Sequence, residues 1–327
     1  MRVSADRIVV VRALPGVGDM LCAVPALRAL RGTAPRAHIT LIGLPNAQWL
    51  LERFHTYFNE LLPFPGFPGI ASLEVDARRT VEFFAEAHER RFDLAIQLHG
   101  DGVAANAFTQ LLGARATAGA HPPDLTAPER DLFIPYPTDV PEAERLLRVL
   151  ANLGANPPRG VEPELPLTGD DSAELADALQ GEPLEPGRYA CLHPGPGPTE
   201  RFVALGEALA ERGLRPVLIG GHEHRRVADA VADALDPDAL DLVGELTLGA
   251  VAALLRDAAI LVGDGLSLAH VAAAVRTPSV AVARPGTDIE RWRPQDRDRH
   301  VVLRGDDELT ADDVLHAAGE LIGLARA

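Results

Sequence analysis

Strand-like and helix-like patterns follow each other closely at the start of the chain. Residues 8–11 read IVVV, a run of β-branched apolar residues typical of a strand buried on both faces of a parallel sheet. A turn rich in proline and glycine follows at residues 15–18, and from residue 20 apolar residues recur at helical spacing as far as Leu30. The pattern predicts a strand, a tight turn and a helix within the first 31 residues.

The same alternation continues through the first half of the chain. Strands are predicted at 38–42, 60–63, 94–98 and 116–118, and helices at 46–54, 76–91, 104–112 and 142–153. Alternation of this kind implies a parallel sheet covered by helices on both faces. Segment 121–139, rich in proline and acidic residues, is expected to be a long surface loop, and segment 156–166 has the composition of a linker.

The second half repeats this plan. Strands are predicted at 189–192, 216–219, 240–243, 259–262 and 280–282, and helices at 172–179, 202–212, 225–235, 249–256, 267–275 and 311–324. We therefore predict an α/β protein with two Rossmann-like halves, residues 1–160 and 161–309, and a ligand in the cleft between them. The C-terminal segment 310–327 is a candidate to pack back on the first domain.

Composition narrows the classes of function. The 327 residues carry a net charge of −16, which argues against a nucleic-acid partner and against tight docking on anionic lipid. No apolar run reaches the ~20 residues of a membrane span, and no signal-peptide pattern opens the chain, so we expect a cytoplasmic protein with at most peripheral membrane association. Cys22 and Cys191 fall in a predicted helix and a predicted strand, where we expect them to act as small hydrophobic residues and not as a disulfide. The sequence leaves the oligomeric state open.

An acidic residue, Asp19, lies at the junction of the first turn and helix. A tight turn before a helix N-terminus leaves backbone N–H groups that can approach an anion, and open α/β sheets place ligands at the carboxyl ends of their strands. Asp19 can therefore cap the helix or act on a ligand, and the local pattern does not choose between the two.

Three turns in the second half also follow predicted strands. The first, HPGPGPTER (193–201), leads into a helix and suits an anionic group, although His193 is equally compatible with a structural role. The second, GGHEH (220–224), has a glycine pair that a base or ribose could approach. Its two histidines lack a third metal ligand at a recognisable spacing and fit exposed residues that open a helix. In the third, GDGLSLAH (263–270), Ser267 could cap the helix or bind a phosphate, and His270 could face a ligand.

These segments together resemble glycosyltransferase family 9, which includes the ADP-heptose:lipopolysaccharide heptosyltransferases. The resemblance covers nearly the whole chain. It rests on R-x5-GD-x4-VPALRALR (12–31), FDLAIQLHG (92–100), EAERLLRVLANLG (142–154), HPG (193–195), LIGG (218–221), LAHVAAA-x-x-TPSVAV (268–282) and RW-x-P (291–294). It implies a GT-B fold, with two Rossmann-like domains facing each other across a cleft. It also implies inverting, metal-independent transfer of a sugar, heptose or a similar hexose, from a nucleotide-diphosphate donor to a hydroxyl of a saccharide or glycolipid acceptor.

The resemblance also assigns roles to residues. Asp19 is expected to be the general base on the acceptor hydroxyl. The residues expected to bind the donor are His193, Gly195, Thr199, Arg201, Gly220, Gly221, Glu223, Asp264, Ser267 and His270. Those expected on the acceptor or phosphate side are Arg12, Gly16, Gly18 and His99. No cofactor or metal is expected, because the donor, for which ADP is one candidate nucleotide, is a co-substrate.

The donor half departs from the family pattern. The basic segment that usually follows HPG is shortened, the chain has no lysine, and Arg201 is the only cation near that turn in the sequence. The Asn-Asp-Thr/Ser-Gly turn is shifted relative to His270, and the acidic position after Gly-Gly holds His224. A catalytically degenerate or donor-switched relative that acts as a binding protein is therefore the alternative. An NAD-dependent oxidoreductase is disfavoured, because Leu21 stands where the dinucleotide fingerprint needs Gly or Ala.

Overall fold

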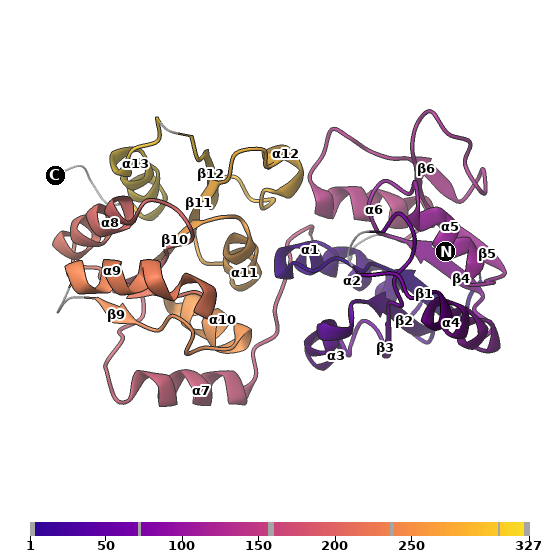
Figure 1. Ribbon diagram of the computed structural model, residues 1–327, viewed down its shortest axis with the longest axis horizontal. Coiled ribbons are helices and arrows are strands. Elements are labelled where there is room, and N and C mark those ends of the chain that lie inside the picture. The colour runs from indigo at the N-terminus through magenta and orange to yellow at the C-terminus, as the bar shows by residue number, and fades with distance from the viewer. Residues whose placement is uncertain (1–3, 71–72, 156–159, 236–238, 307, 324–327) are drawn as a thin grey trace. The chain divides into compact units, whose positions relative to one another are not determined.

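The computed structural model describes residues 4–70, 73–155, 160–235, 239–306 and 308–323. The chain divides into two compact units, residues 1–161 and 162–327, which are shown in Figure 1 and are described separately below. Of the expected linker at 156–166, positions 156–159 lie outside the described residues, and 160–166 contain no helix or strand.

The first unit is built on a six-stranded parallel sheet. Its strands are β1 (Arg7–Val11), β2 (His38–Gly43), β3 (Glu60–Pro63), β4 (Leu94–Gln97), β5 (Ala116–His121) and β6 (Phe133–Pro135). Its helices are α1 (Val17–Leu21), α2 (Val24–Thr33), the 3₁₀ turn η1 (Pro45–Ala47), α3 (Gln48–Phe54), α4 (Ala77–Glu89), α5 (Ala105–Leu111) and α6 (Glu142–Asn152). The strand order is β3-β2-β1-β4-β5-β6, so the order reverses between β1 and β4. This point, where ligands of open α/β sheets bind, lies beside Asp19 and His99 in the chain.

The run IVVV is apolar throughout because both faces of β1 are buried. Val9 and Val11 pack into a core that contains Phe64, Phe83 and Phe108, whereas Ile8 and Val10 are buried on the opposite face. Side chains alternate between the two faces of a strand, so a strand covered on both sides has no position for a polar residue.

The second unit repeats the topology. Its strands are β7 (Tyr189–His193), β8 (Arg215–Leu218), β9 (Leu240–Asp241), β10 (Ile260–Asp264), β11 (Ser279–Ala283) and β12 (His300–Arg304). Its helices are α7 (Gly169–Leu179), α8 (Thr199–Glu211), the 3₁₀ turn η2 (His222–His224), α9 (Arg225–Leu235), α10 (Leu248–Asp257), α11 (Ser267–Val275), α12 (Ile289–Trp292) and α13 (Ala311–Ile322). The order β12-β11-β10-β7-β8-β9 reverses between β7 and β10. The predicted α/β class with two Rossmann-like halves is thus confirmed.

Several local predictions were wrong. Segment 121–139 is not all loop, because β6 pairs with β5 inside it, and β12 and α12 were not predicted. The single helix expected from residue 20 is divided into α1 and α2, and Pro25 occupies the first turn of α2, where the missing N–H is tolerated. The last helix, α13, packs against α8, β10 and β11 within the second unit, where Val314 is fully buried. That segment 310–327 also packs on the first domain stays a prediction.

Two other expectations concern cysteines and membranes. Cys22 and Cys191 are both buried, as expected of small hydrophobic residues, and neither is part of a disulfide. No helix in the described ranges combines the length and apolarity needed to cross a bilayer.

Candidate active site

Asp19 caps the first helix of the chain. Its carboxylate Oδ2 accepts a hydrogen bond from the backbone N–H of Gly16 at 3.0 Å, and Gly16 is the extended residue that precedes α1. A Cβ atom added at Gly16 would lie 2.6 Å from this oxygen, so only glycine leaves room for the carboxylate. The backbone N–H of Gly16, a candidate anion donor in the sequence, thus donates to Asp19 itself. Capping is one of the two roles left open above, and it holds a half-buried carboxylate at the carboxyl end of β1.

Arg12 supports the Asp19 turn through hydrogen bonds to its backbone. Its guanidinium is fully buried and donates from Nε (3.0 Å) and Nη2 (2.6 Å) to the backbone carbonyl of Asp19. Nη1 donates to the carbonyl of Leu98 at 2.7 Å and to Oε1 of Glu142 at 3.1 Å. The guanidinium is desolvated and its four hydrogen bonds go to three protein oxygens, which suits a residue that positions the Asp19 turn. The expected place of Arg12 on the acceptor or phosphate side stays a prediction. Glu142, buried on α6, was missed because nothing local marks it as the partner of Arg12.

Gly18 and His99 complete this end of the first sheet. Gly18 is buried inside α1, and His99 follows β4, the neighbour of β1. The Nδ1 atom of His99 accepts from the backbone N–H of Ala13 at 3.2 Å, so its Nε2 carries the proton in the neutral ring. Asp19 and His99 therefore flank the point where the strand order of the first sheet reverses.

His193 ends β7 and is part of the core of the second unit. Its Nδ1 lies 3.1 Å from the backbone carbonyl of Asp264, which can only accept, so Nδ1 carries the proton. The ring of His224 meets it edge-on at 4.9 Å between centroids. Burial, together with the neighbouring His224, lowers the pKa of His193 to about 4, so the ring is neutral at pH 7.

The three turns predicted to bind the donor meet at this edge of the sheet. A Cβ atom at Gly195 would lie 2.9 Å from the side chain of Asp264, so the HPG turn and the last residue of β10 pack directly on each other. A Cβ atom at Gly220 would lie 3.3 Å from both His193 and His224, which joins the glycine pair to the same cluster. The convergence predicted from sequence is present, and it requires glycine at both turns.

Glu223 lies beside this cluster, with its Oε1 3.5 Å from Nδ1 of His224. Gly221 precedes the short turn η2, in which Glu223 is exposed. Thr199 is the first residue of α8, after Pro198.

Ser267 and His270 differ from expectation. Ser267 is exposed and is the first residue of α11, whereas Leu266 occupies the cap position and no side chain caps this helix. His270 is 5% exposed, and its Nε2 lies 2.8 Å from the backbone carbonyl of Trp292, so it ties α11 to α12. Burial lowers the pKa of His270 to about 4. A donor contact by either side chain stays a prediction.

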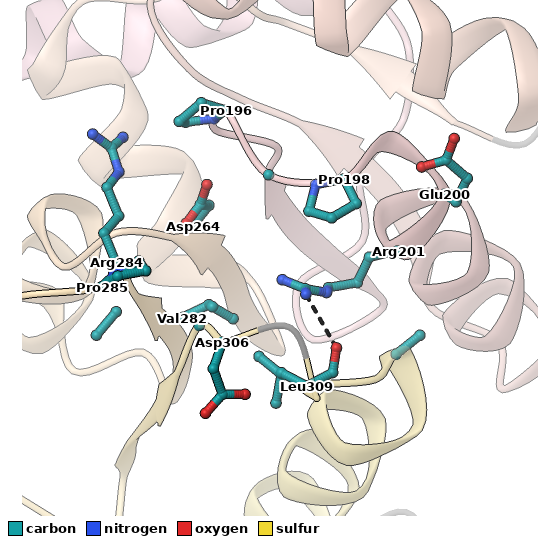
Figure 2. A pocket seen from close by; sticks show the side chains of 14 residues that line it. Pro196, Pro198, Glu200, Arg201, Asp264, Val282, Arg284, Pro285, Asp306 and Leu309 are labelled. Carbon is teal, nitrogen blue, oxygen red and sulfur yellow. Dashed lines mark hydrogen bonds between the residues drawn. The ribbon is translucent and has the colours of Figure 1, made fainter.

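A pocket of about 680 Å³ lies at the carboxyl ends of β10, β11 and β12, beside the turn after β7 (Figure 2). Of the predicted donor residues, Arg201 and Asp264 line it. Sequence reasoning missed Arg284, Asp306 and Glu200, which also line it. The position of Arg284, two residues after the end of the predicted strand 280–282, was a usable signal, because ligands bind beyond the carboxyl ends of strands. Among the residues that the structure describes, no three His, Cys, Asp or Glu side chains gather as metal ligands.

The model of glycosyltransferase family 9 (heptosyltransferase) matches residues 83–314, more than half of the chain. Comparison with curated protein sequences gave no match. Among solved structures, the family 9 glycosyl transferase from Veillonella parvula DSM 2008 is similar, with 19% identity, 99% coverage of both chains and a TM-score of 0.79.

Two E. coli enzymes are also similar. The ADP-heptose LPS heptosyltransferase II has 20% identity and a TM-score of 0.71 over 98% of this chain and 100% of the other. A heptosyltransferase solved with ADP has 20% identity and a TM-score of 0.70 over 96% and 99%. At these identities the likeness shows the fold, and the predicted GT-B class is confirmed. The family match confirms the resemblance seen in the motifs: the chain belongs to glycosyltransferase family 9 and is a glycosyltransferase.

Proposed function

We propose that this protein transfers a heptose or a similar hexose, with inversion and without a metal, from a nucleotide-diphosphate donor to a hydroxyl of a saccharide or glycolipid acceptor. The observation that carries the proposal is the placement of Asp19. The carboxylate is fixed at the carboxyl end of β1 by Gly16, and its backbone is fixed by a buried arginine that touches no solvent. The family match begins at residue 83, so the role of Asp19 rests on this placement and on the sequence motif around it.

In the proposed reaction, Asp19 accepts one proton. The acceptor oxygen forms a bond to the anomeric carbon from the face opposite the diphosphate, and the bond from that carbon to the phosphate oxygen breaks. The electron pair of the broken bond stays on the departing nucleoside diphosphate. The proton of the acceptor hydroxyl passes to the Asp19 carboxylate, which is a general base in this step.

The pocket of the second unit is proposed to hold the donor. It lies where doubly wound sheets bind nucleotides, and Arg201 and Arg284 supply positive charge to it. ADP is the first candidate nucleotide, since an E. coli heptosyltransferase of the same fold was solved with ADP and with ADP-2-deoxy-2-fluoro heptose.

Asp19→Asn tests the base. The Asn side-chain oxygen can still accept from Gly16, so the helix cap and the fold should persist while basicity is lost. We expect kcat to fall by about 10²- to 10⁴-fold, with little change in the melting temperature. Asp139→Asn, which removes the same charge from an exposed side chain of the same unit, is the matched control and should leave kcat unchanged. Full turnover by Asp19→Asn would remove Asp19 from the mechanism.

A donor-switched transferase is a second candidate, and one observation favours it. Three carboxylates, those of Glu200, Asp264 and Asp306, line the donor pocket against two arginines, which is an unusual lining for a dianionic diphosphate. Calorimetry with ADP-, GDP-, UDP- and dTDP-linked sugars separates the candidates. Preference for an ADP-sugar supports the first proposal, and preference for another nucleotide supports the second.

A further inference from the structure

The donor pocket has a shortage of positive charge. Two arginines and three carboxylates line it, so the carboxylates outnumber the arginines by one. The diphosphate of a bound donor would add about two negative charges, and its departure would leave a third. The chain has no lysine, so any side chain that offsets this charge at neutral pH must be an arginine.

The guanidinium of Arg201 is hydrogen-bonded to the protein backbone. Its Nη2 donates to the backbone carbonyl of Leu309 at 3.1 Å and so ties α8 to the segment that leads into α13. Figure 2 shows the guanidinium directed toward Leu309. A change of direction toward a ligand would leave this carbonyl without its donor.

Arg284 is placed differently. It follows the last residue of β11 and is exposed, and its backbone carbonyl accepts from the N–H of Thr287 at 3.1 Å, in a turn that fixes the Cα position. Its guanidinium makes no ion pair or hydrogen bond with any residue that the structure describes. Figure 2 shows the side chain extending past Asp264 to the level of Pro196, two residues that line the same pocket. The positive charge of Arg284 also contributes to the low pKa of His193 at the end of β7, which places the charge close to the HPG turn.

We propose that Arg284 is the residue that binds the diphosphate of the donor, and that Arg201 has a structural role. This inference rests on the proposed function. The planar guanidinium can donate two parallel hydrogen bonds to phosphate oxygens. The same contact stabilises the charge that collects on the phosphate oxygen as its bond to the anomeric carbon breaks. Arg284 thus takes the place of the basic residue that usually follows the HPG turn, since Arg201, the cation of that shortened segment, is bonded to Leu309.

Calorimetry on the full-length chain tests the inference. The probe is whichever of ADP, GDP, UDP and dTDP binds the wild type most tightly, and its own nucleoside serves as the comparison. We expect Arg284→Ala to raise the Kd of the diphosphate by about 10- to 100-fold, because a charge-assisted hydrogen bond is lost. The Kd of the nucleoside, which has no phosphate, should change by less than about twofold, and this also shows that the variant is folded. Arg284→Lys should give an intermediate loss.

Arg304→Ala is the matched control. Arg304 is the last residue of β12, pairs with Ala283 and is exposed, but it does not line the pocket. Its removal changes the net charge by the same amount one strand away, and the Kd of the diphosphate should stay within about threefold of the wild type.

Each other outcome has a definite meaning. Unchanged diphosphate binding by Arg284→Ala, equal losses in Arg284→Ala and Arg304→Ala, or equal losses of diphosphate and nucleoside would each overturn the role of Arg284. A wild type that binds none of the four diphosphates would instead reject the donor assignment of the proposed function, and the inference with it. The wild-type titration is performed first, so the two failures are distinguishable.

Discussion

The buried ion pair between Arg12 and Glu142 yields a quantitative prediction. The two charged atoms lie 3.1 Å apart, and the side chains are 0% and 2% exposed. Glu142→Ala removes the anionic partner of a cation that water does not reach. Loss of one member of a buried pair costs about 3–5 kcal/mol of unfolding free energy, because the other charge stays desolvated. Whole domains are stable by only about 5–15 kcal/mol, so the first unit should lose a large part of its stability.

Glu144→Ala is the control for this experiment. Glu144 lies in the same first turn of α6 as Glu142, so both substitutions remove the same favourable interaction with the helix dipole. Glu144 pairs with Arg148 at 2.9 Å, but both side chains are about 40% exposed, at 39% and 43%. An exposed pair of this kind contributes about 0.5 kcal/mol or less. The difference between the two variants therefore isolates the effect of burial.

Urea denaturation followed by tryptophan fluorescence provides the assay. The chain has two tryptophans, Trp49 in the first unit and Trp292 in the second. In a Trp292→Phe background, Trp49 alone reports the unfolding of the first unit within the full chain. A Glu142→Ala cost no larger than that of Glu144→Ala would refute the reasoning, because it would mean that the pair is not desolvated.

The double variant Arg12→Met/Glu142→Leu separates stability from positioning. Both charges are removed together and replaced by apolar side chains, so much of the stability lost in Glu142→Ala should return. The carbonyl of Asp19 would lose both hydrogen bonds from Arg12. We therefore expect kcat of the double variant to be lower than that of the wild type, although its unfolding free energy recovers. Recovery of both quantities would show that Arg12 stabilises the fold without positioning Asp19.

Two further predictions follow from the glycine at the cap and from the buried histidines. Gly16→Ala places a Cβ atom 2.6 Å from the Asp19 carboxylate, so it should displace that group and lower kcat. Gly169→Ala, which has open space around the new Cβ, should leave kcat unchanged. Equal kcat values for the two variants in steady-state assays would contradict this prediction. Three buried histidines have pKa values lowered by burial to about 4: His193, His270 and His300. The unfolded rings take up protons near pH 6.5 and the folded rings only near pH 4, so stability is full above pH 6.5 and falls between these values, by up to about 3 kcal/mol for each ring. Urea denaturation at pH 7, 6 and 5 should show this fall in unfolding free energy. His270→Gln should make the fall smaller, whereas His316→Gln, at an exposed position, should not. An unchanged pH dependence in His270→Gln would refute the assignment.

Local patterns in the sequence predicted most of the architecture. Apolar runs such as residues 8–11 and 260–262 identify strands buried on both faces, because the alternation of side chains leaves no polar position in them. Glycine turns after β1, β7 and β10 marked the edge of each sheet where ligand-type residues gather. The place of Asp19 at a strand end followed from the same pattern, since strand, turn and helix are contiguous in the chain.

The edge strands β6 and β12 were not predicted, although β3 and β9 at the opposite edges of the two sheets were. The strands β6 and β12 contain three and five residues, and each is defined by pairing with one neighbour, β5 or β11. Both runs are short, and the hydrogen bonds that hold them in a sheet come from residues elsewhere in the chain.

The environments of the charged residues were decided by the tertiary structure alone. Arg12 and Arg284 both follow strands and look alike in the sequence, yet one is fully buried against Glu142, 130 residues away, and the other is exposed at a pocket. His270 and Ser267 were expected at a ligand, but α12 covers the first and the second faces solvent. The sequence by itself determined where strands, turns and the candidate base fall, because these depend on neighbours within a few residues. Which charges are desolvated, paired or left at the pocket depends on segments that meet only when the chain folds, because burial and Coulomb energies depend on distance in space and not on distance along the chain.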